Sequence, residues 1–304
     1  MKFLVAPQPG QVWLVLLLGV CAVSTGAIFV RGAIAAAGQG GVPFSLFIAA
    51  MRMSIAALVF TPAWRQVRRR SPSRRAWGLA IAAGLVLALH FAAWISSLSF
   101  TSIAASTTLV TTNPVWVALL AWGCWGERPR RGTALGIAIA LGGGVLVAWG
   151  GAGESSGSQP LLGNLLALIG AWGASLYFLL GSAAQRQGLG VGSYAAIAYS
   201  TAAIALLPLP LLFGDGYAGY PSAVYLFAVL AALVPQVLGH TSCNWALRWL
   251  SPTLVTLGIL FEPVSSSLLG WFFFQEVPGS LVLVGAPILL AGVAIAVLSQ
   301  REAH

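Results

Sequence analysis

The stretch from Ala76 to Gly126 runs for 51 residues without an Asp, Glu, Lys or Arg. A helix crosses a bilayer with roughly 20 mostly apolar residues, so this stretch is too long for one crossing. The turn-forming sequence SFTS at 99–102 divides it into two. In the whole chain 59% of residues are hydrophobic and 7% are charged, against about 45–50% and about 25% in globular proteins. The sequence therefore predicts an all-α integral membrane protein.

Cutting the other charge-free runs at turn signals predicts ten transmembrane helices. They cover residues 11–31, 42–62, 76–98, 102–125, 132–150, 160–182, 191–213, 222–245, 251–274 and 279–299. A β-barrel would instead show alternating segments of about ten residues. The first span follows Lys2 and resembles a secretory signal. Because this span has a counterpart in the second half of the chain, we interpret it as retained.

Arginine-rich loops predict the orientation, because Lys and Arg accumulate in short cytoplasmic loops. Six arginines between residues 65 and 75 join the second and third spans, and three between 128 and 131 join the fourth and fifth. Alternation then places both termini in the cytoplasm of a protein in the inner, or plasma, membrane. These loops explain the net charge of +9, so we expect contact with anionic lipid and no nucleic-acid partner.

A shift of 149 residues aligns TTNPVWVALLAWGCWGE (111–127) with LFEPVSSSLLGWFFFQE (260–276) without a gap. A weaker match relates LGVCAVSTGAIFVRGA (18–33) to LIGAWGASLYFLLGSA (168–183). We therefore predict two five-helix repeats, residues 1–150 and 151–304, which form one membrane domain around a central cavity. Because five is odd, the second repeat is inverted in the membrane, an arrangement found in secondary transporters that work by alternating access.

These motifs resemble the ten-helix EamA branch of the drug/metabolite transporter (DMT) superfamily. The resemblance also includes IAAMRMSIAALVFTP (48–62) and the glycine-rich segments GTALGIAIALGGGVLVA (132–148) and LVGAPILLAGVAIAV (283–297). It implies a ten-helix basket with a central cavity and the export of small metabolites. Within that branch the chain is similar to the aromatic amino acid exporters.

Polar and aromatic side chains inside the spans are the predicted substrate-binding residues. Gln236, His240 and Asn244 recur every four residues, so they share one face of the eighth span. That face either lines the substrate cavity or makes interhelical hydrogen bonds. The aromatic candidates either stack on a ring-bearing substrate or pack and anchor the helices. The other candidates are Ser24, Thr25, His90, Trp94, Thr111, Trp172 and Ser175.

Two prolines and two charges also fall inside predicted spans. Pro114 and Pro263 each remove a helix hydrogen bond, so we predict a kink at each proline. These kinks either offer freed carbonyls to a ligand in the cavity, act as gating bends or only shape the bundle. Arg52 has either a structural role, in which it bonds backbone carbonyls of its own helix, or a functional role in transport. Glu262 either binds a substrate ammonium, carries a coupling proton or is hydrated near the membrane boundary; its repeat counterpart is the neutral Asn113.

Small residues are predicted to be structural. The glycines of the fifth and tenth spans permit close helix contact, either as scaffold or as a dimer interface: Gly142, Gly143, Gly144, Gly285 and Gly292. The three cysteines lie in apolar spans without a spaced framework, so we interpret them as packing residues. We expect a monomer, with a dimer as the alternative.

Several functional classes are disfavoured. The chain has no G-x-x-x-x-G-K-[ST] loop, which argues against an ATP-driven pump. Its six acids are scattered, and two intramembrane histidines are too few for a metal site, so we predict no enzyme, cofactor or metal. The sequence predicts a secondary exporter of small metabolites, with aromatic or neutral amino acids as the favoured substrates. The alternatives are export of drugs or other metabolites and, least favoured, a membrane-embedded enzyme; uniport and proton coupling both stay open.

Overall fold

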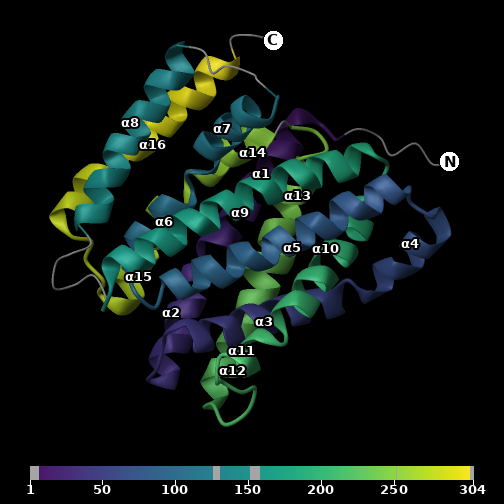
Figure 1. The fold of residues 1–304 in the computed structure, drawn as a ribbon, viewed down its shortest axis with the longest axis horizontal. Helices are drawn as coiled ribbons and strands as arrows, with labels where there is room; N and C mark the ends of the chain where they lie inside the picture. The colour runs from purple at the N-terminus through teal and green to yellow at the C-terminus, as the bar shows by residue number, and fades with distance from the viewer. Residues whose placement is uncertain (1–6, 126–130, 151–157, 251, 302–304) are drawn as a thin grey trace.

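The computed structural model describes residues 7–125, 131–150, 158–250 and 252–301, and within these ranges every regular element is a helix (Figure 1). The elements in chain order are α1 (Pro9–Ser24), α2 (Gly26–Ala37), α3 (Val42–Val59), the 3₁₀ turn η1 (Thr61–Ala63), α4 (Trp64–Arg70), α5 (Arg74–Ser97), α6 (Ile103–Val110), α7 (Asn113–Trp125), α8 (Arg131–Gly150), α9 (Pro160–Arg186), α10 (Val191–Leu206), α11 (Leu209–Leu212), α12 (Ser222–Ala231), the π-helix η2 (Ala232–His240), α13 (Thr241–Ala246), α14 (Pro252–Ile259), α15 (Glu262–Phe274) and α16 (Ser280–Arg301).

Seven helical segments of the described ranges are long and apolar enough to cross a membrane: Gly10–Ala37, Val42–Val59, Arg74–Ser97, Ile103–Leu120, Pro160–Arg186, Val191–Leu212 and Ser222–Ala246. Two shorter apolar helices are Arg131–Val147 and Ser280–Ala296. Large apolar side chains such as Leu141 and Trp149 stay exposed on their outer faces, as lipid contact requires. The prediction of an all-α protein with many membrane-crossing helices is confirmed for these residues.

The long uncharged stretch divides where its turn residues predicted. α5 ends at Ser97 and α6 begins at Ile103. Ser102 caps the new helix, because its hydroxyl accepts a hydrogen bond of 3.1 Å from the Ala105 amide. The chain reverses direction at this turn, so α6 does not continue α5. It lies beside the N-terminal half of α9.

The predicted proline kinks are complete breaks between helices. α6 ends at Val110 and α7 starts at Asn113, while α14 ends at Ile259 and α15 starts at Glu262. Pro114 and Pro263 are thus the second residues of α7 and α15, where the missing N–H would have no helical partner in any case. Shifting the bounds of α6 and α7 by 149 residues gives those of α14 and α15. A further break at Thr25, which the sequence did not predict, separates α1 from α2.

The eighth predicted span is not a uniform α-helix. Its middle, Ala232–His240, forms a π-helix with Pro235 inside it. Gln236, His240 and Asn244 are nevertheless all buried, so the predicted polar face of this span is turned into the bundle.

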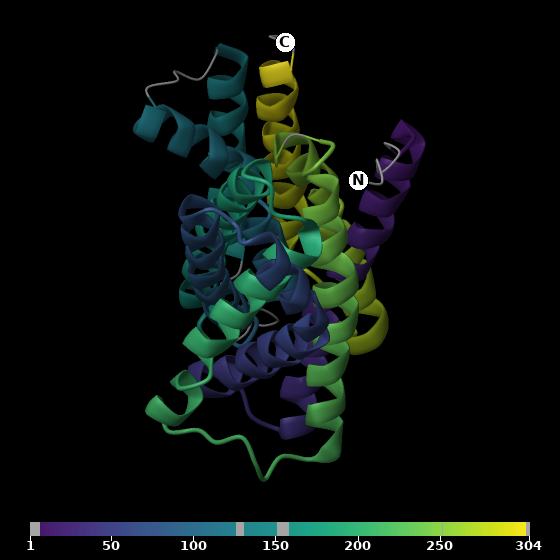
Figure 2. The same ribbon diagram turned by 90° about the vertical axis from the view of Figure 1, so that its right-hand side faces the viewer.

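Glycines bring α8 and α16 into backbone contact. In both views the two helices lie side by side at one edge of the molecule (Figures 1 and 2). A methyl group added at Gly143 would meet the backbone of Leu289, and one added at Gly292 would meet the backbone of Ala140. The two glycine-rich helices are therefore packed against each other within the chain, which is the scaffold role among the two alternatives.

The core of the bundle is built by α5 and α9, which run antiparallel. Gly163 lies against Thr101, Gly170 against Trp94 and Gly173 against His90. The small residues of α9 let its backbone approach α5 closely. As a result His90 and Trp94 are held in the centre of the molecule.

Candidate functional site

A small cavity lies at the centre of the bundle, where α1, α3, α5 and α9 meet the α6–α7 break, the α14–α15 break and the π-helix η2. Its free volume is about 30 Å³, which leaves room for roughly two water molecules. All of its lining residues are buried, His240 being the most exposed at 8%. They are Val23, Arg52, His90, Trp94, Val110, Thr111, Asn113, Ala174, Phe178, His240, Cys243, Ile259 and Glu262.

Arg52 supplies the positive charge of this cavity. Its side chain is fully buried, and its guanidinium carbon lies 4.2 Å from the centre of the Phe91 ring, in cation–π contact. Its Nε donates to Oε1 of Gln236 over 3.1 Å. Its Nη1 has no hydrogen-bond partner. Arg52 is therefore anchored on one side and leaves a charged donor available on the other.

Glu262 supplies the negative charge. It is the first residue of α15 and is 5% exposed, so it is buried in the protein. Its position at a helix start is favourable for a carboxylate, because unpaired amides give that end a partial positive charge. Arg52 and Glu262 are close enough for their charges to attract each other, yet they form no ion pair within 4 Å. The two opposite charges thus face one cavity without neutralising each other directly.

The two intramembrane histidines also meet at the cavity, with ring centres 6.3 Å apart. Nδ1 of His90 lies 2.8 Å from the Gly170 carbonyl oxygen, which can only accept, so this nitrogen carries the proton. The Nε2 of a neutral His90 is then an acceptor. Nδ1 of His240 has no partner. The His90 and Trp94 rings are parallel, with an interplanar angle of 1° and centres 6.1 Å apart.

Several polar atoms around the cavity lack a partner although they are buried. Besides Nη1 of Arg52 and Nδ1 of His240, these are Nε1 of Trp94 and Nε2 of Gln236. A buried donor without a partner costs about 1–3 kcal/mol, so such groups are normally satisfied by protein, water or ligand. Together with the Glu262 carboxylate, the arrangement can bind a small molecule that carries both an anionic and a cationic group.

The predicted site residues separate into those that line the cavity and those that do not. The first set is Arg52, His90, Trp94, Thr111, His240 and Glu262. Thr111 donates its hydroxyl proton to the Thr107 carbonyl of its own helix, 3.0 Å away, so it offers only an acceptor. Pro114 and Pro263 are buried next to the cavity at the starts of α7 and α15.

The remaining candidates make contacts elsewhere. Gln236 acts on the cavity through Arg52, whereas the side-chain nitrogen of Asn244 donates to the Tyr177 hydroxyl over 2.6 Å. Ser24 donates to the Val20 carbonyl and Thr25 to the Ala22 carbonyl, beside the α1–α2 break. Ser175 donates to the main-chain carbonyl of Asn113 over 3.1 Å.

Trp172 lies on the outer face of α9, where it is 39% exposed in a row with Leu165 and Ile169. Ser175, three residues later, is fully buried. Ser175 therefore points into the bundle, and Trp172, three residues earlier on the same helix, does not.

The other lining residues were absent from the predicted site: Val23, Val110, Asn113, Ala174, Phe178, Cys243 and Ile259. Asn113 was noted only as the neutral counterpart of Glu262, and that equivalence was the signal that could have placed it here. Cys243 had been interpreted as a packing residue, and Phe178 carried no pattern at all. Among the described residues no group of three or more His, Cys, Asp and Glu side chains could hold a metal ion.

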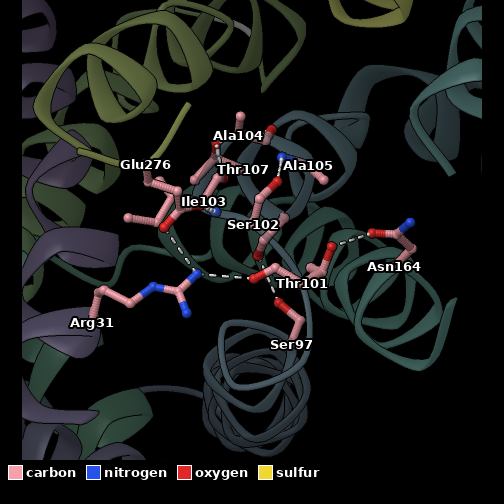
Figure 3. A network of polar contacts seen from close by, with 11 residues as sticks. Arg31, Ser97, Thr101, Ser102, Ile103, Ala104, Ala105, Thr107, Asn164 and Glu276 are labelled. Carbon is pink, nitrogen blue, oxygen red and sulfur yellow. Dashed lines mark hydrogen bonds and ion pairs between the residues drawn. The ribbon is translucent and has the colours of Figure 1, made fainter. Parts of the chain in front are cut away.

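A polar network lies at one end of the bundle (Figure 3). Nη2 of Arg31, on α2, lies 3.3 Å from Oε2 of Glu276 and donates to the Thr101 carbonyl over 2.9 Å. The other carboxylate oxygen of Glu276 accepts from the Ile103 amide, at the start of α6. The Thr101 hydroxyl donates to Oδ1 of Asn164 on α9 over 2.9 Å. The network thus joins four segments of the bundle at the end opposite the arginine-rich turn between α4 and α5.

A helical bundle with apolar outer faces and a small central cavity that polar and charged side chains border is typical of a multi-pass membrane transporter. The model of the EamA-like transporter family matches the chain twice, over residues 11–149 and 161–298. The chain belongs to this family, and the resemblance seen in the sequence is confirmed.

The similar proteins include exporters. The chain is 29% identical over 189 residues to a probable terminal-alkyne amino-acid exporter of Streptantibioticus cattleyicolor, a match that spans 62% of each chain. It is 26% identical over 232 residues to the pseudopaline exporter CntI of Pseudomonas aeruginosa, which covers 76% of this chain and 78% of that protein. It is also 24% identical over 264 residues to an uncharacterized transporter of Archaeoglobus fulgidus, covering 86% and 89%.

A protein of known crystal structure has the same fold. The superposition covers 98% of this chain and 100% of that chain with a TM-score of 0.63. The two sequences are 19% identical, so this likeness describes the fold alone.

Proposed function

We propose that this transporter exports amino acids, or small metabolites derived from them, across the cell membrane. The observation that carries the proposal is the pair of opposite charges, Arg52 and Glu262, that face one buried cavity without forming an ion pair. An α-amino acid presents a carboxylate and an ammonium group a few atoms apart. Arg52 would bind the carboxylate and Glu262 the ammonium, and each charge would then be paired in a site from which water is excluded.

The remaining polar groups fit the same substrate class. Nε1 of Trp94 and a ring nitrogen of His240 are donors for carboxylate oxygens, and the faces of Trp94 and His90 offer stacking to an aromatic side chain. A nucleotide sugar would need several cations for its phosphates, whereas Arg52 is the one arginine among the lining residues. Two similar proteins carry amino-acid or pseudopaline exporter in their names, which supports export as the direction.

The proposed mechanism is alternating access by ten transmembrane helices arranged as two inverted five-helix repeats, residues 1–150 and 151–304. Support comes from the two family matches and from the breaks in α6–α7 and α14–α15, whose bounds agree after a shift of 149 residues. A cavity with room for roughly two waters is too small for an amino acid, so it must widen during transport. The helix breaks at Asn113 and Glu262 border the cavity and are the places where such movement would start.

The Arg31–Glu276 network is proposed to close the external side. It lies at the end opposite the arginine-rich turn, and positively charged loops favour the cytoplasm. This orientation places both termini in the cytoplasm and the protein in the inner, or plasma, membrane. We propose a monomer, because the glycine rows of α8 and α16 are already packed within one chain.

The test uses liposomes that contain the purified full-length protein. Labelled tryptophan, phenylalanine and threonine are offered with and without an imposed pH gradient. As matched probes, tryptamine lacks the carboxylate of tryptophan, and indole-3-propionate lacks its ammonium group. Transport of tryptophan but of neither probe is expected. Equal or faster transport of tryptamine would reject the amino-acid site and favour the export of amine drugs.

The pH gradient separates the two coupling modes. Uptake that is indifferent to the gradient identifies a uniporter, in which Glu262 serves only to bind substrate. Uptake that requires the gradient identifies proton coupling, with Glu262 as the proton carrier.

A further inference from the structure

An apolar pocket lies on the outer side of the break between α6 and α7. Its volume is about 180 Å³. Leu109, Thr112 and Trp116 line it from the two sides of the break, and α8, α9 and α16 supply further lining residues. Thr112 lines this pocket, whereas the preceding residue, Thr111, lines the central cavity. The broken segment is therefore part of the wall between the two spaces.

The pocket is a recess in the lipid-facing surface. Leu141 and Val145, which line it from α8, are 57% and 52% exposed. Leu109 and Leu289, which also line it, are buried and form its inner side. Exposed apolar side chains on the helices of a membrane protein contact lipid, so the pocket is continuous with a surface that acyl chains already cover.

Water does not suit this pocket. Its two polar side chains are satisfied within the protein, because the Thr112 hydroxyl donates to the Leu109 carbonyl over 2.7 Å and accepts from Nε1 of Trp116 over 3.0 Å. Among the described residues that line the pocket, none carries a charge. A buried water needs about two to four polar partners, and an apolar space without them stays dry. An empty pocket would cost the surrounding side chains their packing contacts, so an apolar occupant is favoured.

A pocket of similar size lies on the outer side of the break between α14 and α15. Its volume is about 200 Å³, and Val264 and Leu290 are among its lining residues. A shift of 149 residues pairs them with Val115 and Leu141 of the first pocket. At this break too, the first residue of α15 lines the central cavity and the second lines the outer pocket. Each break therefore lies between the central cavity and an apolar recess.

We propose that an acyl chain of a membrane lipid occupies the pocket behind the α6–α7 break, and that a second chain occupies its counterpart behind the α14–α15 break. The pocket is apolar, offers water no partners and is continuous with the lipid-facing surface, which together suit a hydrocarbon chain. The chain would pack on Trp116 and on the outer side of the broken segment. If the breaks move as the proposed transport mechanism requires, they would slide against a fluid chain and not against protein side chains. That consequence rests on the proposed function, whereas binding of the chain does not.

The experiment measures contact between Trp116 and lipid chains in liposomes. The purified full-length protein is reconstituted in phosphatidylcholine with or without bromine atoms in the middle of its acyl chains, because bromine quenches tryptophan fluorescence at contact. The signal of Trp116 is the difference between the protein and its Trp116→Phe variant. Trp116 is partly buried, and it should nevertheless lose most of its fluorescence in the brominated lipid.

A variant that fills the pocket is the matched test. Gly144 lines the pocket, and a methyl group added there would lie 3.6 Å from Cδ1 of Leu289, an ordinary contact. Gly144→Leu should therefore occupy the pocket and restore the Trp116 fluorescence in brominated lipid. Gly142→Leu adds the same side chain on an exposed part of α8, where nothing lies within 4 Å, and it should leave the quenching unchanged. Added lipid should also raise the unfolding midpoint of the delipidated Gly142→Leu protein more than that of Gly144→Leu.

Several results would overturn the proposal, and none of them depends on which substrate is transported. Trp116 fluorescence that persists in brominated lipid would mean that no chain enters the pocket. Quenching that is unchanged in Gly144→Leu would place the chain elsewhere. Quenching relieved by added tryptophan or phenylalanine would identify a substrate side chain as the occupant, and quenching relieved at high protein density would identify a second copy. If Gly144→Leu does not fold, Gly144→Ala replaces it and should relieve part of the quenching.

Discussion

The breaks between α6 and α7 and between α14 and α15 have nearly the same backbone and opposite chemistry. Both border the central cavity, and both place a proline second in the new helix. At the first break Asn113 is neutral. In the orientation in which its amide nitrogen faces two carbonyl oxygens, this nitrogen donates to Ala171 over 3.0 Å and to Val110 over 2.8 Å. At the second break Glu262 keeps a carboxylate directed at the cavity. The comparison teaches that one duplicated backbone provides a structural joint on one side and a charged binding group on the other.

Carbonyls beside two of the helix breaks accept hydrogen bonds from serines of other segments. Ser175, on α9, donates to the carbonyl of Asn113 at the α6–α7 break, and Ser266, on α15, donates over 2.9 Å to the carbonyl of Ser24 at the α1–α2 break. Breaks free main-chain carbonyls that cost several kcal/mol in an apolar surrounding unless a donor meets them. The serines satisfy this requirement at these two breaks.

The largest expected effect tests that charge. Glu262→Gln should reduce substrate binding by roughly a hundredfold or more, because removing one partner of a buried charge pair costs about 3–5 kcal/mol. Asn113→Ala should reduce binding much less, since Asn113 satisfies the protein's own carbonyls. Isothermal titration with the transported amino acid measures both, and size-exclusion profiles control for folding. Unchanged affinity in Glu262→Gln would contradict the proposed role of the carboxylate.

The next effect concerns the partner charge. Gln236→Leu removes the acceptor of the Arg52 Nε, and a hydrogen bond to a charged group contributes about 1.5–3 kcal/mol. We expect the KM for transport to rise roughly tenfold with a smaller change in maximal rate. Gln185→Leu is the matched control, because Gln185 donates to the Asn244 carbonyl and does not touch Arg52. A similar rise in KM for both variants would mean that Gln236 acts only through stability.

The third effect concerns the closed end. Glu276→Gln weakens the ion pair with Arg31, a partly exposed contact that contributes up to about 1 kcal/mol. The equilibrium should then shift a few-fold toward a form open at that end. Cys243 lines the cavity and is fully buried, so its labelling rate by a small cationic thiol reagent reports the opening. The measurement uses a protein with Cys21→Ser and Cys124→Ser as background, and no acceleration would contradict a gating role.

The smallest effect tests whether serines stabilise the helix breaks. Ser175→Ala removes the hydroxyl that donates to a carbonyl of the α6–α7 break, and Ser266→Ala removes the one that donates to a carbonyl of the α1–α2 break. Each should lower the free energy of unfolding by about 1 kcal/mol, so the two variants should lower the unfolding midpoint equally. Thermal unfolding in detergent compares them, with Ser265→Ala as an exposed control on α15. A large effect of only one variant would show that the two breaks do not depend equally on their serines.

Much of the fold was predictable because it depends on hydrophobic length and on residues that start or end helices. The division at 99–102, the starts of α9 and α10 and the packing role of the glycines in α8 and α16 all followed from local sequence. The number and inverted arrangement of the spans stay predictions. The break at Thr25 was missed, since no proline or glycine pair announces it before Gly26.

The site was only partly predictable, because lining a cavity depends on helix rotation and on distant contacts. His90, Trp94, His240, Arg52 and Glu262 converge although they come from four spans far apart in sequence. Gln236 accepts from Arg52 and Asn244 donates to Tyr177, and a four-residue spacing could not reveal partners that lie on distant segments. Trp172 could not be assigned to the lipid face from sequence, because tryptophan suits both an apolar exterior and an aromatic binding site.

The small size of the central cavity has a consequence for the energy supply of the cell. Every residue that lines it is buried, and its free space is about 30 Å³. A continuous file of water would let protons and ions flow down the membrane potential, which is worth about 2.3 kcal/mol per charge for each 100 mV. A cavity with room for roughly two waters cannot hold a file that crosses a hydrocarbon layer of about 30 Å, so in this form it does not by itself discharge the membrane.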